Sequence, residues 1–89
     1  MNEVEKLRKE VDIIDKKIIE LVAERTDVVY TISRVKGRMN IPTPDAKREE
    51  VVIKQVRELA VANNIEEDFA EELFRKIIAY CREIQKIKQ

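Results

Sequence analysis

The stretch that decides the fold is residues 3–39, which reads EVEKLRKEVDIIDKKIIELVAERTDVVYTISRVKGRM. Its apolar residues recur in steps of four and three, which is the spacing of a coiled-coil seam. The seam consists of Leu7, Val11, Ile14, Ile18, Leu21, Val28, Ile32, Val35 and Met39. The pattern predicts one helix of roughly 50 Å. The rest of the chain is too short to cover such a helix, so we expect it to pair with a second copy.

Two shorter helices are expected after a loop at residues 40–43. Thr43 is a possible cap for a helix over 44–62, with Pro44 in the first turn and Asp45 at the positive end of the helix dipole. Asn63 and Asn64 end that helix, and an acidic stretch begins a third helix over 66–87. The inner face of the second helix is expected to carry Val52, Val56 and Leu59. The sequence thus predicts an all-α fold, a single domain over 1–89 that forms an intertwined helical homodimer.

Composition excludes several classes of function. Lys plus Arg and Asp plus Glu both number 18, so no overall positive charge exists to attract nucleic acid. Without histidine and with Cys81 as the one cysteine, a structural zinc site is not expected. Charges begin at Glu3, which is unlike a signal peptide, and no apolar run suits a membrane span. We therefore expect a cytoplasmic protein that binds neither membrane nor nucleic acid.

The seam has one strong exception, because Arg25 stands where an apolar residue is expected between Leu21 and Val28. A charge in a seam needs a partner or a ligand, although it can also set the register or extend into solvent. Lys36 follows Arg25 by almost three helical turns, about 16 Å along the same side. Taken alone, Lys36 is better explained as a solvated charge beside Val35. Together, the two side chains could close on a small anion.

The other two helices carry further polar residues on inner faces. Arg48 lies four residues before Val52, and Asp45 forms an i,i+3 pair with Arg48. Gln85 continues an apolar stripe of the third helix, where its amide needs a hydrogen-bond acceptor unless the helix end is hydrated. Cys81 in the same stripe is expected to be a small buried side chain, since no histidine could activate it as a nucleophile.

With these residues the sequence resembles the all-α chorismate mutase family, over about Leu7 to Gln85. The resemblance rests on matches in register across three helices, and on the pattern D-x-x-R-E at Asp45, Arg48 and Glu49. The other matching segments are Leu7-Arg8-Lys9-Glu10, Ile14-Asp15, Leu21-Val22-Ala23-Glu24-Arg25, Val35-Lys36, Phe74, Ile77-Ile78 and Gln85. The resemblance implies a three-helix chain whose long first helices cross both subunits of a dimer.

The resemblance also implies the role of each site residue. Arg25 and the partner subunit's Arg8 would bind the two carboxylates of chorismate, with Arg48 close by. Lys36 and Gln85 would donate to the ether oxygen. Glu49 would accept from the ring hydroxyl with Asp45 near it, while Ile32 and Ile78 would form apolar walls. Cys81 stands where we expect a small polar residue such as Ser, which puts one minor substrate contact in doubt.

The implied reaction is the rearrangement of chorismate to prephenate in phenylalanine and tyrosine biosynthesis, which requires no cofactor or metal. Positioning and electrostatic stabilisation of the ether oxygen would carry it. Spacing agrees with a shared site, because Arg8 and Arg25 lie about 25 Å apart on a straight helix. Two alternatives remain. One is an isochorismate pyruvate lyase of the same fold, which the loop Ile41-Pro42-x-Pro44 resembles, and the other is a helical dimerisation module without catalysis.

Overall fold

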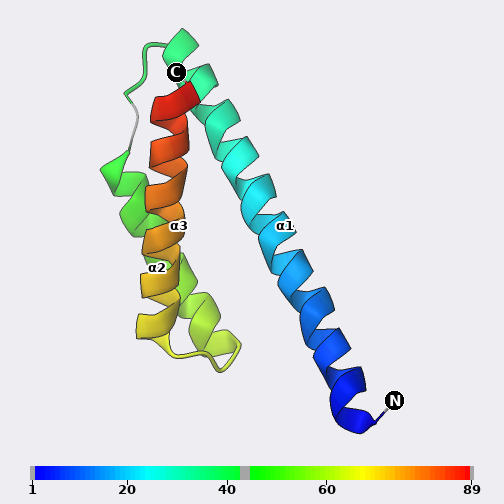
Figure 1. Cartoon of the computed structure of the whole chain (residues 1–89). Helices are drawn as coiled ribbons and strands as arrows, with labels where there is room; N and C mark the ends of the chain where they lie inside the picture. Colours follow the sequence, from blue (N-terminus) through cyan, green and yellow to red (C-terminus); the bar gives the residue numbers. More distant parts are fainter. Residues whose placement is uncertain (1, 43–44, 89) are drawn as a thin grey trace.

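Three helices make up the part of the chain that the computed structural model describes, residues 2–42 and 45–88, with side chains described as far as Lys86. They are α1 (Glu3–Arg38), α2 (Ala46–Ala62) and α3 (Glu67–Lys88). The all-α fold with a long first helix is therefore confirmed. Helix α3 contacts both other helices, and the chain is elongated, with extents of 57 × 27 × 15 Å (Figure 1).

Helix α1 has 36 residues, so it is about 54 Å long. The side chain of Asn2 caps its start by accepting a hydrogen bond of 2.8 Å from the backbone N–H of Glu5. Its end is closed by Asn40, which adopts a left-handed conformation with φ of 57°. The N–H of Ile41 then donates to the carbonyl of Lys36 at 2.8 Å. Asparagine tolerates this conformation better than most residues, which explains why the helix ends here.

Helix α2 begins two positions later than a cap at Thr43 would require. Asp45 is the capping residue, because its carboxylate accepts a hydrogen bond of 3.0 Å from the backbone N–H of Arg48. Thr43 and Pro44 lie outside the described residues. Asn64, with φ of 58°, follows the end of α2 in the way that Asn40 follows α1.

The apolar core lies between α2 and α3. Val56, Ala60 and Ala70 form a buried cluster against which Val52 and Phe74 pack. The expectation that Leu59 lies on the inner face of α2 is wrong, because 61% of its surface is exposed. A 3.6-residue period places Ile53, Val56 and Ala60 inward instead, and these three are buried.

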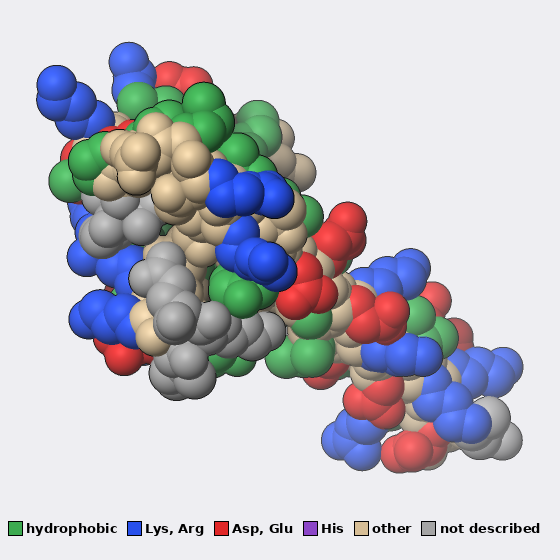
Figure 2. Space-filling view, turned by 90° about the horizontal axis from the view of Figure 1, so that it is seen from above, with side chains coloured by type: hydrophobic (Ala, Val, Ile, Leu, Met, Phe, Trp, Pro, Cys, Tyr) green, Lys and Arg blue, Asp and Glu red, His purple; other side chains and the backbone are tan. Residues whose placement is uncertain are grey.

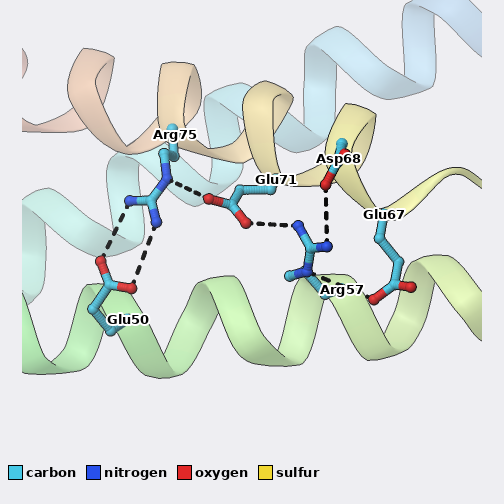
Figure 3. A network of polar contacts seen from close by, with 6 residues as sticks. All are labelled: Glu50, Arg57, Glu67, Asp68, Glu71 and Arg75. Atoms are coloured by element: carbon cyan, nitrogen blue, oxygen red, sulfur yellow. Dashed lines mark hydrogen bonds and ion pairs between the residues drawn. The ribbon is translucent and has the colours of Figure 1, made fainter.

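Ion pairs also join α2 to α3, as Figure 3 shows. Arg57 contacts Glu71 at 2.7 Å and Asp68 at 3.1 Å, and Arg75 contacts Glu71 at 2.8 Å. The network, here called the α2–α3 ion network, consists of Glu50, Arg57, Glu67, Asp68, Glu71 and Arg75. The hydrogen bonds from Arg75 and Arg57 lower the pKa of Glu71 below its ordinary value.

Small and polar side chains join α1 to α3. Thr26 and Ser33 are the buried residues of α1, and Cys81 of α3 is 3% exposed. The hydroxyl of Thr26 donates to the carbonyl of Val22 and lies 3.7 Å from the sulfur of Cys81. Because both hydroxyls bond to the backbone of their own helix, they can be buried without loss of hydrogen bonds.

The first half of α1 makes a different surface. Every residue from 2 to 21 is exposed, and this half projects away from α2 and α3 (Figures 1 and 2). All nine seam residues have exposed fractions between 39% and 63%. The single chain therefore leaves an apolar stripe uncovered along the whole of α1. Among the described residues, no helix is long and apolar enough to cross a membrane.

Candidate active site

A cavity of about 530 Å³ lies between the second half of α1, the start of α2 and the end of α3. We call it the three-helix cavity. It collects nine of the ten site residues expected from the sequence: Arg25, Ile32, Lys36, Asp45, Arg48, Glu49, Ile78, Cys81 and Gln85. Three segments that are far apart in the sequence thus meet at one place.

Arg8 is the expected site residue that does not line the cavity of its own chain. It lies on the projecting half of α1, where its guanidinium contacts Glu5 at 3.2 Å and its side chain is 72% exposed. Such an exposed pair adds little stability. Arg8 is thus available to a second molecule.

Arg25 is held in place by α3. Its Nη1 donates to the sulfur of Cys81 at 3.4 Å, and its guanidinium lies over the ring of Phe74, 5.9 Å from the centroid. Stacking on an aromatic ring orients a guanidinium without neutralising it. Arg25 therefore keeps its positive charge at the wall of the cavity.

Lys36 and Asp45 face each other across the junction of α1 and α2. The ammonium of Lys36 lies 3.9 Å from Oδ2 of Asp45, while Oδ1 caps α2. The backbone N–H of Arg48 is the main cause that lowers the pKa of Asp45, and the charge of Lys36 acts in the same direction. The sequence predicted a pair between the side chains of Asp45 and Arg48. Instead, the carboxylate of Asp45 accepts a hydrogen bond from the backbone N–H of Arg48 as the cap of α2. An ionised carboxylate thus lies beside Lys36 at ordinary pH.

Glu49 is occupied by a partner that the sequence reasoning missed. Arg82 of α3 donates to both carboxylate oxygens of Glu49, from Nε at 2.8 Å and from Nη2. Arg82 also lines the cavity. Its position was detectable, because it lies four residues after Ile78 and three before Gln85, on the same face of α3.

Gln85 and Cys81 complete the α3 wall. The amide of Gln85 donates to the carbonyl of Val29 at 3.5 Å, and its side chain is half-buried rather than fully hydrated. That bond uses one of the two N–H groups of the amide, so the other remains for a ligand. Cys81 is buried, as expected for a small apolar side chain, and its sulfur contacts Arg25.

The charges of the cavity are unevenly paired. Lys36 faces Asp45 and Arg82 faces Glu49, whereas within the described residues neither Arg25 nor Arg48 has a carboxylate partner. Two guanidinium groups are thus left for an anion. Within the same residues, no group of acidic, cysteine or histidine side chains could hold a metal ion.

Six further residues line the cavity: Leu21, Glu24, Val28, Val29, Val52 and Arg82. Val29 could have been found from the spacing alone, because positions 25, 29, 32 and 36 share one side of the helix. Leu21 and Val28 were identified as seam residues, so a seam position can also face the cavity.

The chain is similar to known proteins over most of its length. The family described as chorismate mutase type II matches residues 7–86. A chorismate mutase of Methanocaldococcus jannaschii is 31% identical over 80 residues, which cover 90% of this chain and 81% of that relative. A 4-amino-4-deoxychorismate mutase of Streptomyces venezuelae is 30% identical over 82 residues, which cover 91% of this chain and 80% of that relative.

A longer relative shows the same similarity over part of its length. The bifunctional chorismate mutase/prephenate dehydratase of Buchnera aphidicola subsp. Schizaphis graminum is 32% identical over 77 residues, 86% of this chain but 20% of that relative. The family match over residues 7–86 includes all of α2, most of α1 and α3, and every residue of the cavity wall. The chain therefore belongs to the chorismate mutase type II family, and its activity is that of a chorismate mutase, an isomerase.

Proposed function

We propose that the three-helix cavity binds chorismate as a dianion and holds it in the compact shape from which it rearranges to prephenate. The observation that carries this proposal is the pair Arg25 and Arg48, two guanidinium groups at the cavity wall without a carboxylate partner in the described chain. Chorismate carries two carboxylates. A planar guanidinium can bind a carboxylate through two parallel hydrogen bonds, so these groups can fix the substrate in position.

Lys36 and Gln85 are proposed to stabilise the reacting ether oxygen. Negative charge grows on this oxygen as its bond to the ring breaks, and no proton transfer is required. Lys36 supplies a charged donor and Gln85 a neutral one, and each keeps at least one N–H beyond its bond within the chain. A preorganised donor of this kind typically contributes about 3–4 kcal/mol to catalysis.

The remaining side chains are proposed to orient the substrate ring. Glu49 accepts a hydrogen bond from the ring hydroxyl, and Asp45 keeps Lys36 and the start of α2 in place. Ile32 and Ile78 supply apolar walls. Cys81 contributes through Arg25, whose guanidinium it contacts.

We further propose that the active form is a homodimer in which the partner subunit's Arg8 completes the site. The uncovered apolar stripe of α1 supports this, because nine seam residues at heptad spacing remain exposed in the single chain. Arg8 lies about 25 Å from Arg25 along the helix and cannot reach the same small ligand within one chain. In a dimer with crossed first helices, the apolar stripe of α1 would be covered and the partner subunit's Arg8 could reach the cavity.

Product analysis is the first test of this proposal. Pure protein is incubated with chorismate, and substrate loss and product are followed by chromatography. We expect prephenate at a rate proportional to enzyme concentration. Release of pyruvate from isochorismate, without prephenate from chorismate, would instead indicate the lyase, and no turnover of either by a folded dimer would indicate a dimerisation module.

A mixing experiment tests the shared site. Arg8→Ala and Lys36→Ala chains should each be inactive, but a mixed dimer contains one site that has both groups. We therefore expect part of the activity to return after the two variants are mixed and allowed to exchange subunits. Absence of recovery after confirmed exchange would argue against donation of Arg8 by the partner.

Two related substrates differ in one substituent on the substrate ring. The Streptomyces venezuelae relative is named for 4-amino-4-deoxychorismate, which differs from chorismate by an amino group in place of the ring hydroxyl. Glu49 is the side chain proposed to contact this position. The groups around Glu49 therefore decide which of the two substrates is preferred.

A further inference from the structure

The ion pair between Glu49 and Arg82 lies at the wall of the three-helix cavity. Arg82 approaches with two N–H groups, one to each carboxylate oxygen, which is the strongest geometry for such a pair. The side chain of Glu49 is 21% exposed and that of Arg82 is 41% exposed. The pair is thus partly shielded from water and in contact with any ligand of the cavity.

The packing of α2 on α3 does not by itself require the ion pair between Glu49 and Arg82. The buried cluster around Val56 already joins α2 to α3, and so does the α2–α3 ion network (Figure 3). No member of that network lines the cavity. Arg82 is therefore the arginine of α3 that combines an ion pair to α2 with a place at the site.

The pair changes what Glu49 can bind. A carboxylate has about four acceptor positions, so two remain after Arg82 has taken its two. A neutral hydroxyl can donate to one of them. An alkylammonium would meet a carboxylate whose charge Arg82 already balances, at a cavity wall that has four cationic side chains and three carboxylates. Arg82 therefore removes most of the attraction that an unpaired carboxylate would offer to an ammonium group.

We infer that Arg82 is a positioning and specificity-determining residue, which holds Glu49 as an acceptor for a neutral ring substituent and disfavours a cationic one. The inference rests on the proposed function, because it assumes that Glu49 faces the substrate ring. It predicts that the wild-type protein prefers chorismate over 4-amino-4-deoxychorismate, whose alkyl amine is protonated near neutral pH.

The test compares kcat/KM for the two substrates in matched variants. Arg82→Met should lower kcat/KM for chorismate and raise the relative preference for 4-amino-4-deoxychorismate by roughly tenfold or more, because the carboxylate of Glu49 is then free to attract the ammonium group. Arg82→Lys keeps the charge but loses the two-pronged geometry. It should therefore keep the preference for chorismate while turnover falls. Arg75→Met is the matched control, because Arg75 also pairs α3 with α2 but lies outside the cavity.

A second background shows whether Arg82 acts through Glu49. In a Glu49→Gln chain, adding Arg82→Met should produce no further loss of kcat/KM for chorismate, because no carboxylate remains for Arg82 to hold. The inference is overturned if Arg82→Met changes both substrates by the same factor as Arg75→Met, or if it still lowers kcat/KM for chorismate in the Glu49→Gln background. A wild-type protein that converts neither substrate would instead overturn the proposed function, and this inference with it.

Discussion

The two halves of α1 belong to the same unbroken helix but have different tasks. The half from Glu3 to Leu21 is exposed and projects away from the other two helices (Figure 1). The half that follows packs on α3 through Thr26 and Ser33 and supplies Arg25 and Lys36 to the cavity. The comparison teaches that the apolar seam, which runs through both halves, is not what folds the single chain. The apolar cluster between α2 and α3 and the small polar contacts between α1 and α3 do that, while the seam stays exposed.

The largest expected effect is on turnover, which depends on Lys36 in the second half of α1. Lys36→Ala should lower kcat by about 10²–10³-fold while the helical signal stays unchanged, because it removes a donor to the ether oxygen but no packing. Lys16→Ala, a lysine of the exposed half, is the matched control and should keep wild-type turnover. Steady-state kinetics and circular dichroism check both. An active Lys36→Ala enzyme would remove Lys36 from the mechanism.

The second effect is on dimer formation and is tested at Ile14 in the first half of α1. Ile14→Glu should raise the dissociation constant of the dimer by on the order of 100-fold, because an unpaired carboxylate in an apolar seam is costly. Lys16→Glu places the same charge on the opposite side of the helix and should leave the dimer intact. Sedimentation at several protein concentrations measures the difference. Equal behaviour of the two variants would contradict pairing through the seam.

The third effect is on the free energy of unfolding and tests how much the α2–α3 core contributes to it. Ile53 is 4% exposed, so Ile53→Ala should lower the free energy of unfolding by about 2 kcal/mol, at the low end for such substitutions because the core is small. Leu59→Ala should cost less than about 0.5 kcal/mol, as for most surface positions. Chemical denaturation measures both. A loss at Leu59 as large as that at Ile53 would show that a partner subunit covers Leu59.

The smallest effect concerns pH. The lowered pKa of Glu71 means that its carboxylate stabilises the fold above its ordinary pKa of about 4.5, and that this contribution disappears as pH falls through the folded value. Glu71→Gln should therefore be less stable than wild type at neutral pH and equally stable in strong acid. Glu72→Gln, which lacks an ion pair in the described chain, should follow wild type throughout. Melting curves over an acidic pH series test this.

Much of the fold could be predicted because its signals are local. The 3.6-residue period and the asparagine pair at 63–64 give three helices whose ends fall within two residues of those observed. Leu59 shows where such reasoning fails. It belongs to an apolar stripe as regular as any other, and only the approach of α3 decides which stripe of α2 is covered.

The site shows the same division between local and long-range information. Arg25 could be recognised because it interrupts a regular seam, and polar residues such as Lys36, Arg48 and Gln85 because they lie on inner faces. The family resemblance added Glu49, Ile32 and Ile78 to the positions that meet at the cavity. The face of α3 that carries Arg82 could also be predicted from helical spacing, but its ion pair could not, because the sequence does not show which carboxylate it contacts. Its meaning comes from Glu49, 33 residues earlier and on another helix. Pairs of this kind appear only when the helices are placed in space.

The α2–α3 ion network has a consequence for the temperature range of the enzyme. Removing charged groups from water becomes less costly as temperature rises, so linked ion pairs contribute more to stability in a hot environment than at 25 °C. This network lies on residues that do not line the cavity (Figure 3). The ion pairs of this network are thus separate from the side chains that line the cavity. Substitutions at Arg57 and Arg75 can therefore change their contribution to stability without altering the cavity wall.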